Sequence, residues 1–259
     1  MTNNHYTFGE NDLAARRLAL LADAYEAPSR AFLGAWGMAG IEHAVDLGCG
    51  PGYTTALVQS VLHPEQMTGL DASDKLLAQA RASVAGAAFV RHDVTRAPFP
   101  CAAADLLFCR FLVTHLDDPA AALRAWAQAA SPGARLLIQE TASLESDDAI
   151  FRRYYQMVGA LQSSYGQSLH IGASLDGIVA GNGWTILASE LAVVEQAPQV
   201  MARLHTMNIR TWGRDSAAVA QFSPEDIATV QAELDRFAAG ERQAPPVRNA
   251  LRQLVAVVG

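Results

Sequence analysis

The sequence predicts an α/β fold in which a doubly wound, mostly parallel sheet is covered by helices on both faces. Short apolar runs alternate with helix-length segments from residue 44 to residue 139, which is the pattern of parallel strands buried on both sides. The glycine-rich turn GCGPG, residues 48–52, follows the first apolar run and precedes a helix. Glycines there let the backbone approach a ligand closely, so a ligand site is expected at this turn.

The length of 259 residues fits one large α/β domain with an insertion, and 51% of the residues are apolar, enough for a sizeable core. A net charge of −7 argues against nucleic acid as a partner, because phosphate binding normally needs a basic face. The three cysteines show no C-x-x-C spacing, so neither a disulfide framework nor a metal site is indicated. No signal peptide and no membrane-length apolar run is recognised, so we expect a soluble, cytoplasmic protein with no membrane partner.

Residues 1–40 are expected to form an irregular arm followed by a helical cover. Apolar residues recur at helical spacing from Leu13 to Trp36, and Asn11 or Asp12 can cap the first helix. Pro28 is expected to start or break a second helix. Residues 41–259 are expected to form the main domain.

The alternating segments of the main domain are assigned by length and apolar pattern. The expected strands are residues 44–47, 66–70, 88–91, 105–109 and 134–139, and the helices between them are residues 53–62, 74–84 and 119–130. Ser131, Pro132 and Gly133 are expected to form the turn before the fifth strand, which should end at Glu140.

The alternation changes after Glu140. Helices are expected at residues 147–161 and 173–180, a sixth strand at 184–195, a helical insertion at 199–240 and a final strand at 251–258. We expect residues 145–180 and 199–240 to form a helical lid over the substrate.

Two short motifs narrow the class of ligand expected at the glycine turn. The third glycine of a dinucleotide-binding G-x-G-x-x-G turn would fall on Tyr53, so the turn departs from that pattern. GCGPG followed by LDAS, which ends the next strand at Asp71, resembles the first two motifs of class I S-adenosylmethionine (AdoMet) dependent methyltransferases.

The resemblance extends over nearly the whole chain. DLLFCRFLVTHLDDPAAAL and SPGARLLIQE are similar to segments of small-molecule methyltransferases of the ubiquinone-biosynthesis type, and YTFGENDLAARRLALLA resembles the arm and helix of a bacterial subgroup. The resemblance implies a Rossmann-like seven-stranded sheet with the last strand antiparallel. An Asn-Pro-Pro-Tyr or Asp-Pro-Pro-Tyr element is absent after the fourth strand, which disfavours DNA bases and protein glutamine as acceptors.

The glycine turn and Asp71 are the main cofactor candidates. Gly48, Cys49, Gly50 and Gly52 would pass beside the methionine part and ribose, and Asp71, followed by Ala72, would accept hydrogen bonds from the ribose hydroxyls. A tight turn without a ligand is the structural alternative. Asp46 is expected to be buried, to orient the loop and to reach the cofactor's ammonium through water.

Further cofactor residues follow from the resemblance. Asp93 and Val94 would hold the adenine, although Asp93 could instead cap the turn from Thr95 onward. Arg110, directly after the fourth strand, could meet the cofactor carboxylate or an anionic substrate, or could be a surface arginine.

Two N-terminal residues match positions in the subgroup's arm and helix. Tyr6 and Arg17 would place a hydroxyl and a cation near the cofactor carboxylate. The alternative for Arg17 is a solvated helix face.

Two residues near the strand ends are candidates for catalysis. His115 could accept a proton from a hydroxyl or amine during methyl transfer, or could be a packed histidine bonded to backbone. Glu140 is a second candidate base or substrate anchor, or a cap for local backbone. His170, His205, Trp212, Met201 and Met207 are specificity candidates in the lid, with core packing as the default.

The sequence thus predicts a methyltransferase that transfers the methyl group of AdoMet to an O, N or C atom of a small molecule of secondary or cofactor metabolism, leaving S-adenosylhomocysteine. An AdoMet-binding enzyme that catalyses a cyclisation or rearrangement, a non-catalytic partner subunit and an NAD-dependent enzyme are the alternatives. No metal is required. The acceptor and the oligomeric state are open, with a homodimer as one option.

Overall fold

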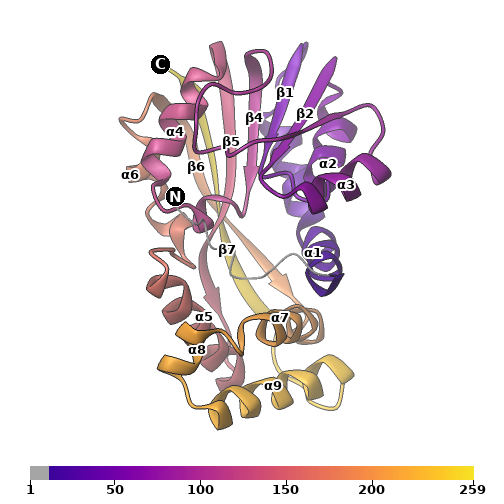
Figure 1. Cartoon of the computed structure of the whole chain (residues 1–259), viewed down its shortest axis with the longest axis vertical. Coiled ribbons are helices and arrows are strands. Elements are labelled where there is room, and N and C mark those ends of the chain that lie inside the picture. Colours follow the sequence, from indigo (N-terminus) through magenta and orange to yellow (C-terminus); the bar gives the residue numbers. More distant parts are fainter. Residues whose placement is uncertain (1–11) are drawn as a thin grey trace.

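The computed structural model describes residues 12–259, with side chains from residue 16 onward. It consists of a sheet with helices on both faces and a group of helices at one end of the sheet (Figure 1). No helix of the described residues is both long enough and apolar enough to cross a membrane.

The sheet has seven strands in the order β3-β2-β1-β4-β5-β7-β6. Strand β7 is antiparallel to both of its neighbours and the other pairs are parallel, which confirms the predicted mostly parallel sheet with an antiparallel last strand. The strands are β1 (His43–Leu47), β2 (Gln66–Asp71), β3 (Ala88–Arg91), β4 (Ala104–Arg110), β5 (Ala130–Glu145), β6 (Trp184–Gln196) and β7 (Val247–Val258).

Helices cover the sheet on both faces, as a doubly wound fold requires. Helices α1 (Asp12–Trp36) and α2 (Tyr53–Leu62) pack on one face, where Leu33 and Val58 share a core with Phe108 of β4. Helices α4 (Pro119–Gln128) and α6 (Leu175–Val179) pack on the other face, where Trp126 is fully buried. Helix α3 (Asp74–Ser83) covers β3.

Strands β5, β6 and β7 continue past the ends of the other strands and carry a second group of helices. Their pairing extends as far as Glu145 with Arg248 and Gln196 with Val247. The group consists of α5 (Ala149–Ser164), α7 (Pro198–Trp212), α8 (Ser216–Gln221) and α9 (Pro224–Ala239), which we call the lid helices. They lie beyond the end of the sheet at which α1 also projects (Figure 1).

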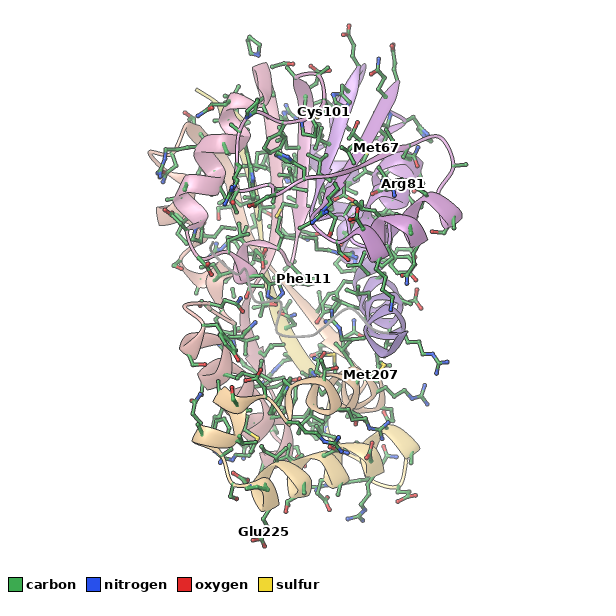
Figure 2. All side chains as sticks on the ribbon, viewed as in Figure 1. Met67, Arg81, Cys101, Phe111, Met207 and Glu225 are labelled. Carbon is green, nitrogen blue, oxygen red and sulfur yellow. The ribbon has the colours of Figure 1, made fainter. Side chains whose placement is uncertain are left out.

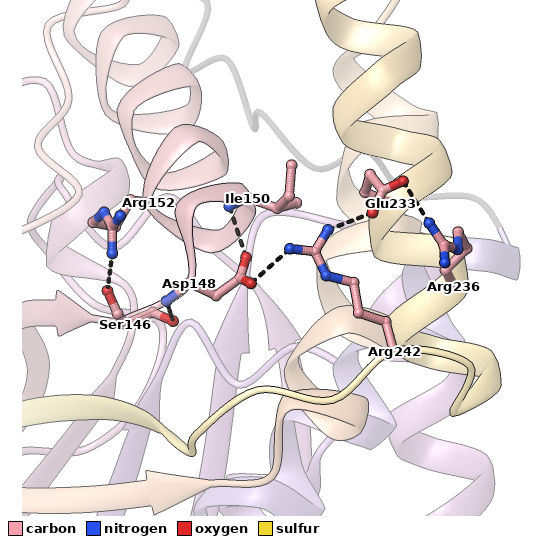
Figure 3. A network of polar contacts seen from close by, with 7 residues as sticks. All are labelled: Ser146, Asp148, Ile150, Arg152, Glu233, Arg236 and Arg242. Carbon is pink, nitrogen blue, oxygen red and sulfur yellow. Dashed lines mark hydrogen bonds and ion pairs between the residues drawn. The ribbon is translucent and has the colours of Figure 1, made fainter.

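The lid helices have a hydrophobic core of their own, built around residues such as Phe151, Leu161, Trp212 and Phe237. Arg242 joins three parts of this group, because its guanidinium contacts Glu233 of α9 and Asp148 at the start of α5, the latter at 2.8 Å (Figure 3). Asp148 also caps α5 by accepting from the amide of Ile150 at 2.7 Å.

Pro28 neither starts nor breaks a helix, contrary to the sequence prediction, and α1 continues through it. Proline removes the amide that would bond the carbonyl four residues earlier, here Ala24. The side-chain amide of Gln196 on β6 donates to that carbonyl instead, and Arg110 of β4 donates to the next one, at Tyr25. The sheet therefore supplies a hydrogen bond to Ala24 in place of the one that the helix lacks.

The fifth strand is also longer than predicted. It already pairs with β4 at Ala130, includes Ser131 to Gly133 and continues five residues beyond Glu140. The continuation is stabilised by β7, which pairs with β5 as far as Glu145. Because that pairing partner comes from the end of the chain, the local pattern around Glu140 gave no sign of it.

The remaining elements lie close to their predicted positions, with α2 and β3 matching the predicted bounds. The helix expected at 173–180 is reduced to α6, preceded by the short 3₁₀ helix η2 (Ile171–Ala173).

Candidate functional site

A cavity of about 330 Å³ lies between the carboxyl ends of the parallel strands, helix α1 and the lid helices α5 and α7. The glycine loop and the strand ends form one wall, and side chains of α5, α7 and β7 form the other, which we call the lid wall. Phe111 is part of the lining and lies between the sheet and the lid helices (Figure 2). Segments far apart in the sequence thus enclose one space.

The glycine loop borders the cavity. Gly48 and Gly50 have φ angles of 65° and 52°, in the left-handed region that favours glycine. A Cβ on Gly48 would come within 2.7 Å of the Leu112 side chain, whereas a Cβ on Gly50 would meet nothing within 4 Å. The backbone at Gly50 therefore faces open space in the cavity, as a loop that carries a ligand should.

Asp71 at the end of β2 holds this loop. One carboxylate oxygen accepts from the Gly50 amide at 2.9 Å, and the other accepts from the Ser73 amide at 2.8 Å. Ala72 and Asp71 both line the cavity. Each carboxylate oxygen can accept more than one hydrogen bond, so Asp71 keeps capacity for a ligand hydroxyl.

Asp46 lies beneath the loop and is 1% exposed. Its Oδ2 accepts from the hydroxyls of Thr54 and Thr55 at 2.6 and 2.7 Å, which fixes the first turn of α2. Burial raises the pKa of Asp46 to about 6, against the effect of these two hydrogen bonds. Its Oδ1 has no hydrogen-bond partner among the described residues.

Cys49, which lines the cavity as the second residue of the glycine loop, is buried. Burial, together with the negative charges of Asp46 and Asp71, raises the pKa of its thiol well above the ordinary value. The side chain therefore stays a neutral thiol at physiological pH and supplies bulk rather than a nucleophile.

Asp93 and Val94 line the cavity after β3. Asp93 accepts from the amide and the hydroxyl of Thr95 at 3.1 and 2.6 Å and pairs with Arg96 at 3.0 Å. These contacts are those of the turn cap considered as the alternative from the sequence. They leave the carboxylate at the cavity wall, so a role in adenine binding stays a prediction.

The cavity contains two cationic side chains from the described residues, Arg17 of α1 and Arg110 of β4. Arg17 is only 4% exposed, so it does not lie on a solvated helix face. Arg110 donates to the Ser29 hydroxyl at 2.9 Å, which ties the end of β4 to α1, and burial lowers its pKa to about 10. Tyr6 lies outside the described residues.

His115 also lines the cavity, at the end of the 3₁₀ helix η1 (Val113–His115). Burial and the nearby charge of Arg17 lower its pKa to about 4, while a hydrogen bond with Gln167 acts in the opposite direction. The imidazole is therefore neutral at physiological pH and has the protonation state that a base requires.

Glu140 is fully buried on β5, and its Oε1 accepts from the Val113 amide at 2.6 Å. Burial raises the pKa of Glu140 to about 8, although bonds from the amides of Val113, Leu112 and Thr114 lower it. At neutral pH the carboxyl is mostly protonated. Its backbone contacts are those of the local cap considered from the sequence, and a role as a base stays a prediction.

Of the five lid residues singled out in the sequence, the structure brings His205 and Met201 to the cavity. Trp212 is buried in the core of the lid helices, and Met207 and His170 do not line the cavity. Sequence reasoning missed several polar lining residues, among them Tyr25, Tyr154, Tyr155, Asn208 and Asn249. The aromatic face of α5 was a usable signal for the two tyrosines of that helix, but single asparagines carry none.

Within the described part of the chain, no group of His, Cys, Asp and Glu side chains converges in a way that could hold a metal ion.

Part of the chain that lines this cavity is similar to a known protein family. Residues 45–138, which contain the glycine loop, Asp71, Asp93 and His115, match the family model described as "Methyltransferase domain". These residues, about a third of the chain, are thus similar to a methyltransferase domain.

Curated proteins are similar to this chain over part of its length. A trans-aconitate 2-methyltransferase of Methylobacterium nodulans is 34% identical over 134 residues, or 52% of this chain and 52% of that protein. The Escherichia coli K12 enzyme of the same name is 38% identical over 78 residues, 30% of this chain and 31% of that protein. The matched segments thus span about half or less of these relatives.

Solved structures share the fold of this chain over most of its length. A methyltransferase candidate from Bacillus halodurans C-125 superimposes with a TM-score of 0.61 at 15% identity and covers 88% of this chain and 96% of that one. The [4+2]-cyclase SpnF gives 0.57 at 17% identity, with coverages of 92% and 83%. Phosphoethanolamine N-methyltransferase 2 of Haemonchus contortus, solved with S-adenosyl-L-methionine, gives 0.55 at 17% identity, with coverages of 93% and 57%.

Proposed function

We propose that this protein transfers the methyl group of AdoMet to a small-molecule acceptor bound in the cavity beneath the lid helices. The observation that carries the proposal is the arrangement of that cavity. A glycine loop held by Asp71 faces it from one side, and an uncharged wall of the lid helices faces it from the other. Cofactor and acceptor would meet between the two walls.

The residues of the first wall fit AdoMet. The space over Gly50 admits a ligand, Asp71 can accept from ribose hydroxyls, and the Asp93 carboxylate and the Val94 backbone would meet the adenine. Arg17 and Arg110 supply positive charge for the cofactor carboxylate. Asp46, with one oxygen that has no partner among the described residues, would attract the cofactor's ammonium.

When bound, AdoMet supplies a methyl group on a positively charged sulfur, and the bond to the acceptor forms as the carbon–sulfur bond breaks and its electrons pass to sulfur. The protein's part is to align the acceptor and keep water out, which can remove several kcal/mol of barrier. His115 would accept the proton that a hydroxyl or amine acceptor loses. Glu140 would hold the η1 backbone that carries His115.

The matches with the curated relatives cover only 30 to 52% of this chain. We therefore do not assign the acceptor of those relatives to this protein. SpnF, a [4+2]-cyclase, has the same fold, so a cyclisation is the competing function that we consider. No side chain of the cavity favours that reaction over methyl transfer.

The test is a calorimetric titration of the purified protein with AdoMet and with NAD, followed by incubation with methyl-labelled AdoMet and a panel of acceptors. We expect AdoMet binding, no NAD binding and one S-adenosylhomocysteine per methylated product. Absence of AdoMet binding, or turnover without S-adenosylhomocysteine, would contradict the proposal.

A further inference from the structure

The lid wall of the cavity carries several buried polar side chains for which the proposed cofactor has no use. Tyr154 and Tyr155 of α5, His205 and Asn208 of α7, and Asn249 of β7 all line the cavity, and each is at most 7% exposed. Apolar neighbours such as Met201 and Leu204 lie among them in the same wall. The wall is therefore largely apolar with a few polar groups, as expected for a small-molecule site.

Hydrogen bonds hold these polar side chains in place. The Asn208 amide donates to the Tyr154 hydroxyl at 3.0 Å, and the Tyr155 hydroxyl lies 3.0 Å from His205 Nε2. The His205 ring stacks on Tyr154 with 4.2 Å between the ring centroids. Asn249 donates to the Tyr25 hydroxyl at 2.8 Å. Each polar group thus has a fixed direction before a ligand arrives.

The same side chains leave hydrogen-bonding atoms unused. Asn208 Oδ1, Asn249 Oδ1, Gln162 Oε1 and His205 Nδ1 are buried and have no hydrogen-bond partner among the described residues. A buried polar atom without a partner is costly, so a ligand or water is expected to complete these bonds. Three of the four are amide oxygens, which only accept hydrogen bonds, so the matching ligand must donate them.

The lid wall is also uncharged. The arginine and acidic lining residues among those described, Arg17, Asp71, Asp93, Arg110 and Glu140, come from α1 or from the strand ends of the other wall. Burial lowers the pKa of His205 to about 3, so this ring is neutral as well. Arg17 of α1 acts electrostatically on Tyr154 of this wall. At Asn208 Oδ1 and Asn249 Oδ1, however, a carboxylate would face further acceptor atoms.

We infer that the lid wall binds an uncharged acceptor with an apolar body and at least one hydroxyl or N–H group, which donates to Asn208 and Asn249. This inference rests on the proposed function, because it takes the lid wall as the acceptor site. It separates this protein from its curated relatives, since trans-aconitate presents carboxylates rather than donors. Asn208 and Asn249 would be specificity-determining residues.

The experiment measures the binding of phenol and benzoate to the protein saturated with S-adenosylhomocysteine, using ligand-observed NMR titrations. The two probes share an apolar ring, but phenol donates a hydrogen bond and benzoate is an anion that only accepts. We expect phenol to bind at least about tenfold more tightly than benzoate. Equal or tighter benzoate binding, or no phenol binding up to the highest soluble concentration, would overturn the inference.

Two variants then test the named residues independently. Asn208→Leu and Asn249→Leu keep the side-chain volume and remove the acceptor oxygen, so each should weaken phenol binding at least about fivefold. Asn182→Leu is the matched control, because Asn182 bonds Arg124 and the Ile178 carbonyl outside the cavity. Unchanged phenol affinity in both cavity variants would contradict the assignment.

Affinity for S-adenosylhomocysteine, measured first by calorimetry in every protein, distinguishes the possible failures. A wild-type protein without this affinity would refute the proposed function itself. Wild-type affinity for S-adenosylhomocysteine with a preference for benzoate would refute only the acceptor class. Retained affinity in the variants shows that they are folded.

Discussion

The Asp71 carboxylate accepts a hydrogen bond from the Gly50 amide at 2.9 Å, which joins the end of β2 to the glycine loop that follows β1. Strands β1 and β2 are parallel neighbours, so this contact links the segments that follow their carboxyl ends at the cofactor side of the cavity. The same carboxylate bonds the Ser73 amide at the start of α3. One side chain therefore sets the relative position of three segments around the proposed ribose site.

Replacing Asp71 by alanine should weaken AdoMet binding by about 100-fold or more, because it removes the proposed acceptor for the ribose and frees the loop at Gly50. Isothermal titration calorimetry measures this. Asp74→Ala is the control, since Asp74 is an exposed acid three residues away that pairs with Arg91 at 3.1 Å. Equal AdoMet affinities for wild type and Asp71→Ala would rule out the ribose assignment.

Replacing His115 by alanine should lower turnover by about 100-fold or more with little loss of AdoMet affinity, if this imidazole takes the acceptor's proton. Because the pKa of His115 is lowered to about 4, its state does not change between pH 6 and pH 9, and it should give no inflection of the wild-type rate in that range. Single-turnover rates of methyl transfer give both results.

His170→Ala is the control for this prediction, because His170 is exposed and outside the cavity. A rate for His115→Ala equal to that of wild type would leave His115 with a packing role alone.

Glu140 should make the stability of the protein depend on pH. Its pKa is raised from 4.5 to about 8 in the folded state, so between these values the folded chain holds a proton that the unfolded chain has lost. The contribution to stability is complete below pH 4.5 and is lost as the pH rises towards 8. The expected loss is on the order of a few kcal/mol.

The measurement compares urea unfolding at pH 5 and pH 8 for wild type and Glu140→Gln. The glutamine keeps an oxygen for the Val113 amide but does not titrate, so the variant should lose less stability than wild type between the two pH values. Glu145→Gln, on the exposed end of the same strand, should behave like wild type. An identical pH dependence in Glu140→Gln and wild type would contradict the shifted pKa.

Gln196 should stabilise α1 by bonding the Ala24 carbonyl that Pro28 leaves without an amide. Gln196→Ala should lower the free energy of unfolding by about 1 kcal/mol. In a Pro28→Ala background the new amide at position 28 can bond Ala24, and the cost of Gln196→Ala should fall. A double-mutant cycle from urea unfolding measures this coupling, and additive effects would show that the two residues act independently.

Much of the sheet could be predicted because its signals are local. The apolar runs of β1 to β4 and the turn GCGPG depend on residues close together in the sequence. The length of β5 and the continuity of α1 could not be predicted in this way. Strand β7 pairs with the end of β5 from more than 100 residues away, and Gln196 reaches Ala24 across 172 residues.

On the cofactor side of the site, too, local signals could be predicted and long-range contacts could not. Gly48, Gly50, Asp71 and Asp93 belong to short motifs at strand ends, and parallel strands bring their carboxyl ends to one edge of the sheet. Their presence in one cavity was therefore expected from the sequence. The contacts that Asp93 and Glu140 make with Thr95 and Val113 were open alternatives, which only coordinates could describe.

The sequence by itself determined the fold class and the place where a cofactor is expected, because both depend on periodic patterns and on a short turn within about 30 residues. Which residues form the lid wall was decided by the tertiary structure alone. Tyr154, His205, Asn208 and Asn249 are distant in the chain and carry no motif, and they meet because three long strands hold α5 and α7 over the end of the sheet. Which hydrogen-bonding atoms are left for an acceptor follows from how these side chains bond one another, which is a property of packing.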